Sequence, residues 1–203
     1  MYEVEQSEEI YAGKIFRLVR DAVHMPDGRT AIREVVLHPG AAVVVALDDE
    51  ENVVLLRQYR HPVRVYLWEL PAGLLDVAGE PAHVGAAREL AEEAALVATT
   101  WHTLLDLRSS PGFSDEAVRV FLARGLSDVP VADRYVGQHE EADMTIERVP
   151  LDEAVARVLA GDIENAAAAA GVLAAWTARA REWADLRPAD APWRAKPALA
   201  APA

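Results

Sequence analysis

The chain has 203 residues, of which 52% are hydrophobic and 26% charged, a composition typical of one globular domain with room for a small appendage. Its formal net charge of -13 opposes extended binding to nucleic acid or to an anionic membrane, because both are held mainly by clustered Lys and Arg. The absence of cysteine excludes disulfides, thiolate nucleophiles and zinc held by thiolates.

No apolar run approaches the roughly 20 residues that a membrane-spanning helix needs. The first residues, Met1 to Glu5, are acidic where a signal peptide would carry a basic region. We therefore expect a cytoplasmic protein.

The first part of the chain has the pattern of strands. Residues 1–38 alternate apolar and polar positions between turn signals at Gly13 and Gly28, which predicts short antiparallel strands. Two apolar runs follow, at residues 41–47 and 53–59, separated by a turn-rich acidic segment. We interpret these two runs as a hairpin of buried strands.

The middle of the chain mixes one helix with further strands. Apolar and small residues recur at helical spacing over residues 84–96. Strands are expected at residues 104–107 and 118–123, on either side of a loop. A turn-rich acidic segment, residues 133–143, precedes a strand at 144–149.

The last part of the chain is predicted to be helical. Helices are expected at residues 151–160 and 165–183, and the Pro- and Ala-rich tail at residues 187–203 is expected to be flexible. The resulting class is α+β, with three parts: an N-terminal β region (1–38), a main domain (39–186) and the tail (187–203).

Three glutamates dominate the helix at residues 84–96. Glu89, Glu92 and Glu93 share one helix face, and like charges at this spacing repel one another. A hard divalent cation would compensate, and carboxylates without Cys or paired His suit Mg²⁺ or Mn²⁺ rather than zinc. The alternative is an ordinary solvated helix face.

Gly73, Glu80 and the run from Arg88 to Leu96 together resemble the signature box of the Nudix hydrolases. Two departures stand out, since the segment between Gly73 and Glu80 is one residue longer than in the family pattern, and Ala95 replaces the last glycine. An alanine in the left-handed conformation costs roughly 1 kcal/mol. Because no ligand side chain is lost at this position, we expect the departure to affect the structure and not the metal site.

This resemblance implies the Nudix fold, a mixed β-sheet sandwiched between helices, here with a small N-terminal antiparallel sheet. It also implies roles for the residues of the box. The metal ligands would be the backbone carbonyl of Ala72 with the side chains of Glu89, Glu92 and Glu93, and the structural residues would be Gly73, Glu80 and Arg88, the last two paired with each other.

The segments outside the box resemble the ADP-ribose pyrophosphatase group, especially its actinobacterial members. The similar segments are residues 33–36, 58–62, 68–73 and the loop at 111–116. By position, Arg33 and Arg60 would contact the diphosphate or adenosine half, with Glu69 and Glu116 near the ribose or base. An acidic chain needs such local cations for a diphosphate, although a surface role is the alternative for either arginine.

The resemblance implies Mg²⁺-dependent hydrolysis of ADP-ribose to AMP and ribose 5-phosphate, with Mn²⁺ as a substitute. The general base is expected on the acidic loop at residues 139–143, where we favour Glu141 and keep Glu140 as the alternative. Two other functions remain open. One is hydrolysis of another nucleotide sugar, such as ADP-glucose or GDP-mannose, and the other is a sensor that binds ADP-ribose without hydrolysing it.

A homodimer is expected as well. Residues 1–38 form too few strands for a core of their own, and an isolated small sheet is only marginally stable in water. The resemblance implies that these strands pack across a two-fold axis and carry Arg33 to the substrate of the other subunit.

Overall fold

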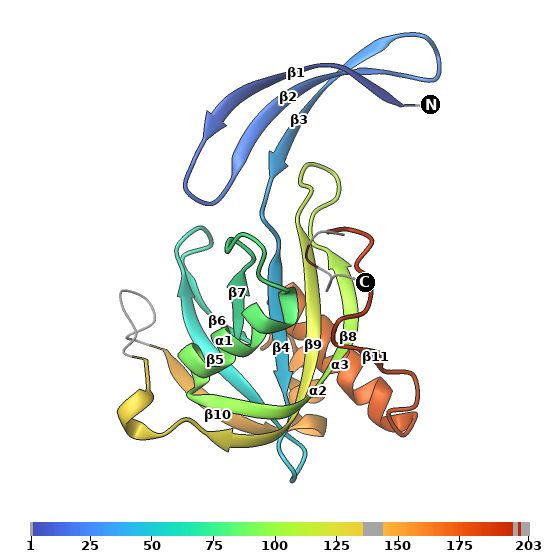
Figure 1. The fold of residues 1–203 in the computed structure, drawn as a ribbon. Helices are drawn as coiled ribbons and strands as arrows, with labels where there is room; N and C mark the ends of the chain where they lie inside the picture. Colours follow the sequence, from blue (N-terminus) through green and yellow to red (C-terminus); the bar gives the residue numbers. More distant parts are fainter. Residues whose placement is uncertain (1, 136–143, 197–198, 200–203) are drawn as a thin grey trace.

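A computed structural model of the chain describes residues 2–135, 144–196 and 199. In it, a body of sheets and helices carries a separate three-stranded sheet that extends away from it (Figure 1). The strands are β1 (Glu3–Ala12), β2 (Arg17–His24), β3 (Thr30–Leu37), β4 (Ala41–Ala46), β5 (Asn52–Arg60), β6 (Val65–Glu69), β7 (Ala72–Leu74), β8 (Leu96–Arg108), β9 (Ala117–Asp128), β10 (Thr145–Pro150) and β11 (Arg187–Pro188). The helices are α1 (Ala82–Ala94), α2 (Leu151–Ala160) and α3 (Ala166–Ala180), with a short 3-10 helix η1 (Val131–Asp133).

The extended sheet contains β1, β2 and β3 in that order, all antiparallel, which confirms the strands predicted for the N-terminal part. Every residue of β1 is exposed. Exposed apolar side chains on this sheet include Val4, Ile10, Tyr11 and Ile32. A short linker, His38 to Gly40, joins β3 to the first strand of the body.

The body is built on two sheets, and this arrangement corrects the predicted hairpin. β4 lies in a five-stranded sheet, where it pairs in parallel with β9 and antiparallel with β7. β5 lies in a three-stranded sheet between β10 and β6. The predicted runs meet at one isolated bridge beyond the end of β4, Leu47 with Val53. Both runs are apolar because both strands are buried, and burial alone does not specify which strand pairs with which.

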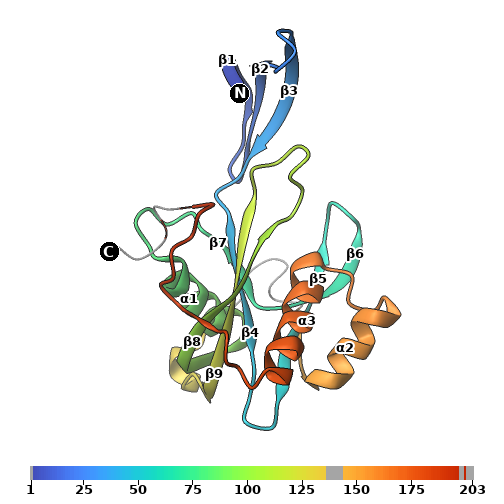
Figure 2. The same cartoon turned by 90° about the vertical axis from the view of Figure 1, so that its right-hand side faces the viewer.

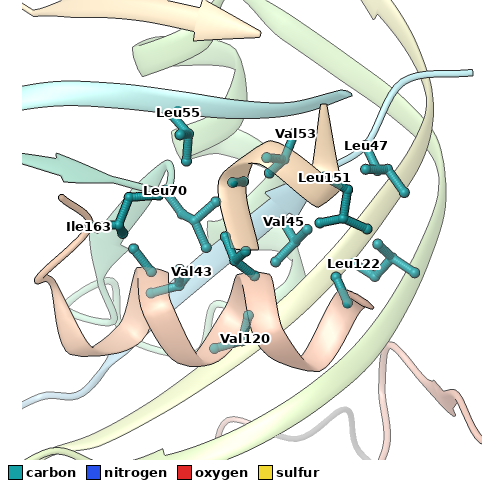
Figure 3. Close-up of a cluster of buried hydrophobic side chains, with 14 of the residues drawn as sticks. Val43, Val45, Leu47, Val53, Leu55, Leu70, Val120, Leu122, Leu151 and Ile163 are labelled. Atoms are coloured by element: carbon teal, nitrogen blue, oxygen red, sulfur yellow. The ribbon is translucent and has the colours of Figure 1, made fainter. Parts of the chain in front are cut away.

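Helices cover both faces of the mixed five-stranded sheet, as the Nudix resemblance implied. Figure 2 shows α1 on one side of β4, β8 and β9, with α2 and α3 on the other. Side chains of β4 alternate between the two faces, so Val43 and Val45 join the cluster under α3 while Ala42 and Val44 join the cluster under α1. Figure 3 shows the first of these clusters. Among the described residues, no helix is both long and apolar enough to cross a membrane.

The tail is the second correction, because residues 187–196 are packed rather than flexible. β11 pairs with β8, and Trp193 is only 2% exposed. The physical reason lies in β9, where the buried guanidinium of Arg119 donates hydrogen bonds to the carbonyl oxygens of Ala191 and Pro192. A buried arginine needs partners for its donors, and the composition of the tail does not reveal that it supplies them.

Candidate active site

Helix α1 carries the three glutamates and ends where the Nudix box has its last glycine. Ala95 caps the helix with φ 52° and ψ 37°, the left-handed conformation, and its N–H donates to the carbonyl oxygen of Leu90. The expected strain at this alanine is therefore present. The helix thus ends in a left-handed residue without a glycine, at a cost of roughly 1 kcal/mol.

Arg88 lies at the centre of the box. Its guanidinium is 2.7 Å from an oxygen of Glu89 and 3.3 Å from oxygens of Glu80 and Glu92. The predicted pairing of Glu80 with Arg88 is thus observed. Arg88 thus joins Glu80 of the preceding loop to two acidic side chains of the helix, Glu89 and Glu92.

Gly73 gives Glu89 the space that it occupies. A Cβ atom at position 73 would lie 2.0 Å from the carboxyl carbon of Glu89, so any larger residue would displace this carboxylate. The glycine of the box therefore lets Glu89 take the position that it has here. β7 and α1 meet at this point, and the carboxylate lies directly against the backbone.

The third glutamate is oriented by the backbone of β7. The carboxylate of Glu93 accepts a hydrogen bond of 2.8 Å from the N–H of Ala72. Glu89, Glu92 and Glu93 together line a cavity of about 210 Å³, whose other walls include Arg134 and Tyr135. All three glutamates of the predicted metal set thus line one cavity.

The electrostatics of this cavity favour added positive charge. Burial raises the pKa of the Glu89 carboxyl group, and the nearby charges of Glu92 and Asp76 raise it further, against the lowering effect of Arg88. For Arg88, burial acts to lower the pKa, but hydrogen bonds and charges from Glu80 and Glu89 raise it above its usual value. Burial is the largest of these effects and works against the ionised form of Glu89, and a cation bound beside this carboxylate would offset that cost.

The donor set fits a hard divalent cation. The side chains that face the cavity from α1 offer carboxylate oxygens alone, with neither sulfur nor imidazole among them. Within the part of the chain that the structure describes, no three acidic or histidine side chains already converge as a metal cage. The carboxylates instead contact Arg88 and the Ala72 N–H. Ala72, Glu89, Glu92 and Glu93 are the residues that would hold the ion.

A second cavity brings together three of the four predicted substrate residues. Arg60, Glu69 and Glu116 line a space of about 270 Å³, together with Ala72 and Asn165. Glu69 is 4% exposed, and its two oxygens accept hydrogen bonds of 2.8 and 2.6 Å from Nε and Nη2 of Arg60. This bidentate pair fixes the guanidinium on the cavity wall.

Arg33 lies apart from both cavities. It is exposed on β3 in the extended sheet, and its guanidinium donates to the carbonyl oxygen of the neighbouring Ile32. The two candidates for the general base, Glu140 and Glu141, lie outside the described residues.

Sequence reasoning missed two groups of residues that line the cavities. Asn165 caps α3 through its side chain and also faces the Arg60 cavity, so its capping pattern gave a signal for the helix but none for the site. Arg134 and Tyr135 precede the acidic loop and line the glutamate cavity. They belong to no sequence motif, and only the tertiary structure places them beside the glutamates.

These features define a Nudix hydrolase, and the comparisons with known proteins agree. The model of the NUDIX domain matches residues 36–170, so the chain belongs to the Nudix family, whose members generally use a divalent metal. Residues 2–36 match the model of the nucleoside diphosphate sugar hydrolase N-terminal domain.

The chain is also similar to individual proteins of known name. The ADP-ribose pyrophosphatase of Mycobacterium tuberculosis (strain H37Rv) is 53% identical over 97% of this chain and 93% of its own length. That of Bacillus subtilis (strain 168) is 35% identical over 78% of this chain and 84% of its own. A solved structure, an ADP compounds hydrolase, superposes with a TM-score of 0.73 at 21% identity, covering 90% of this chain and 93% of that one.

Proposed function

We propose that this protein hydrolyses the diphosphate bond of ADP-ribose to AMP and ribose 5-phosphate, with Mg²⁺ as its metal. One observation carries the proposal. Ala72 lines the cavity of Arg60, Glu69 and Glu116, and its N–H also holds Glu93 of the acidic helix. A diphosphate bound beside Arg60 therefore lies next to the carboxylates that would hold the metal.

The charges of the Arg60 cavity fit the two halves of this substrate. Arg60 offers a fixed, planar cation for a diphosphate, and an acidic chain needs such local positive charge to bind one. Glu116 offers carboxylate oxygens that accept hydrogen bonds from ribose hydroxyl groups. The identity to the two ADP-ribose pyrophosphatases supports the same choice.

The chain's own residues orient the reacting groups. Gly73 and Ala72 fix the carboxylates of Glu89 and Glu93, and the Glu69–Arg60 pair holds the diphosphate. A divalent cation held by Ala72, Glu89, Glu92 and Glu93 would supply charge neutralisation for the diphosphate and acidify the attacking water. We assign the proton transfer from the attacking water to Glu141, with Glu140 as the alternative, and expect Glu141→Gln to lower kcat with KM nearly unchanged.

We also propose a homodimer in which the extended sheet completes the site of the other subunit. Arg33 and the exposed apolar side chains Val4, Ile10, Tyr11 and Ile32 all lie on the sheet that extends from the body. A partner would cover these side chains, and Arg33, which lines neither cavity of its own chain, would reach the Arg60 cavity of the other subunit.

A panel of substrates tests the proposed specificity. ADP-ribose, ADP-glucose and GDP-mannose are each incubated with the protein and Mg²⁺, and kcat/KM is measured for each by chromatography of the nucleoside monophosphate released. ADP-ribose should give the highest kcat/KM. A higher value for either of the other two would show that the protein is a hydrolase of another nucleotide sugar. Tight binding of ADP-ribose without turnover would instead indicate a sensor.

A further inference from the structure

The C-terminal segment at residues 187–196, which we call the strap, is tied closely to the body although both domain models end before it. Arg187 of the strap donates to Asp106 of β8 at 2.8 Å. Trp193 is buried, and the guanidinium carbon of Arg119 lies 4.8 Å from the centre of its ring. The strap therefore has a firm anchor on the sheet.

The anchor depends on the burial of Arg119, which is 1% exposed. Its guanidinium contacts Asp106 at 2.7 Å and donates to the carbonyl oxygens of Ala191 at 2.6 Å and Pro192 at 3.1 Å. A buried guanidinium is tolerated only when its donors are satisfied, so the sheet fixes the path of the strap. The next residues of the strap, up to Lys196, are thereby held in a fixed position.

The strap ends against the linker between the extended sheet and the body. The ammonium of Lys196 donates to the carbonyl oxygen of His38 at 2.9 Å and lies 3.8 Å from Asp115. Its stem passes Gly40, where an added Cβ would lie 3.4 Å from the Cε atom of Lys196. Lys196 thus contacts both the linker and Asp115, the residue directly before Glu116.

The linker and the loop before β9 are also tied to each other. The N–H of His38 donates to the carboxylate of Asp115 at 2.7 Å, and the N–H of Asp115 donates to the carbonyl oxygen of Val36 at 3.0 Å. Glu116 follows directly and lines the Arg60 cavity, with one oxygen 3.7 Å from Nδ1 of His38. A displacement of the linker or of Asp115 therefore moves a wall of that cavity.

We propose that Lys196 is a positioning residue for substrate binding, which holds His38 and Asp115 together and so fixes Glu116 in the cavity wall. Its positive charge also offsets the carboxylate of Asp115, which otherwise repels the neighbouring Glu116 and an incoming diphosphate. The inference rests on the proposed function, because it takes the Arg60 cavity as the site for ADP-ribose. Lys196 acts on the fit of the substrate, so its loss raises KM more than it lowers kcat.

The test is Lys196→Met, which keeps an apolar stem against Gly40 and removes the ammonium. Its matched control is Arg194→Met, since Arg194 is an exposed cation two residues earlier that forms no ion pair with the described residues. The rescue variant is Lys196→Arg. Lys196→Met should raise KM for ADP-ribose about fivefold, the scale of losing one ordinary hydrogen bond, with kcat within about twofold of wild type. The other two variants should stay near wild type.

Hydrogen–deuterium exchange gives a readout that does not depend on turnover. Peptides that cover residues 36–40 and 109–117 should exchange faster in Lys196→Met and unchanged in Arg194→Met. An unchanged KM and unchanged exchange in Lys196→Met would overturn the proposal, as would a fall in kcat alone. If the wild-type protein does not hydrolyse ADP-ribose, the proposed function is wrong, and exchange at these two segments alone decides the role of Lys196.

Discussion

The carboxylate of Glu93 and the backbone N–H of Ala72 are joined by a hydrogen bond of 2.8 Å that connects the acidic helix to the wall of the Arg60 cavity. The contact uses the carboxylate as an acceptor, a role that an amide oxygen can also fill. Charge and hydrogen bonding at this position can therefore be separated by substitution.

Glu93→Gln should lower kcat by about 100-fold, the scale of losing one electrostatic group in a transition state. The fold should be intact, because the amide oxygen can still accept from Ala72. The measurement pairs kcat with the rise in Tm on adding Mg²⁺, which the variant should largely lose. Wild-type turnover in the variant would rule out the metal site on α1.

Glu89→Gln should change how stability depends on pH in the absence of divalent metal. Burial raises the pKa of Glu89, so the folded protein holds this proton more tightly than the unfolded chain. Between the ordinary carboxyl pKa and the raised one, the folded state binds more protons, and the free energy of unfolding falls as pH rises through that window. The variant has no such proton, so in EDTA it should lose less stability toward neutral pH. Denaturant titrations at several pH values check this, and parallel curves for the two proteins would contradict it.

Arg60→Met should both weaken substrate binding and destabilise the fold. It leaves the buried carboxylate of Glu69 without its bidentate partner, and we expect a loss of about 2 kcal/mol, below the usual cost of breaking a buried pair because Arg60 is itself 44% exposed. Adding Glu69→Gln should restore part of the stability and none of the binding. Additive effects of the two substitutions on stability would show that the pair is not coupled.

The strand pattern of the N-terminal part predicted its sheet correctly, and helical spacing predicted α1 within two residues at each end. These features are local, since they depend on the alternation of apolar residues along one segment. The left-handed conformation of Ala95 was also predictable, because Ala95 replaces a glycine of the box at the end of a helix.

The pairing of β4 and the packing of the strap were not predictable in this way. β4 finds its parallel partner β9 from far along the chain, and two equally apolar neighbours in sequence suggested a hairpin instead. The strap is ordered by one buried arginine on β9, and Arg119 gives no sign in the sequence that its partners are the carbonyl oxygens of Ala191 and Pro192. Such contacts belong to the tertiary structure alone.

The proposed dimer predicts that two inactive variants can restore each other. Arg33→Ala and Glu93→Gln chains are mixed and refolded, then assayed with ADP-ribose. If Arg33 serves the other subunit, half of the randomly paired dimers carry one intact site, so about a quarter of wild-type activity should return. Complete absence of recovery, once subunit exchange has been verified, would mean that Arg33 does not act across the interface.

The central claim is that the acidic helix and the Arg60 cavity together hydrolyse ADP-ribose. The most direct measurement is the amount of AMP and of ribose 5-phosphate formed from ADP-ribose by wild-type protein, with Mg²⁺ and with EDTA. The account predicts equal amounts of the two products with Mg²⁺, formation of neither in EDTA, and full recovery when Mg²⁺ is restored. Intact ADP-ribose after prolonged incubation with Mg²⁺, or undiminished product formation in EDTA, would contradict it.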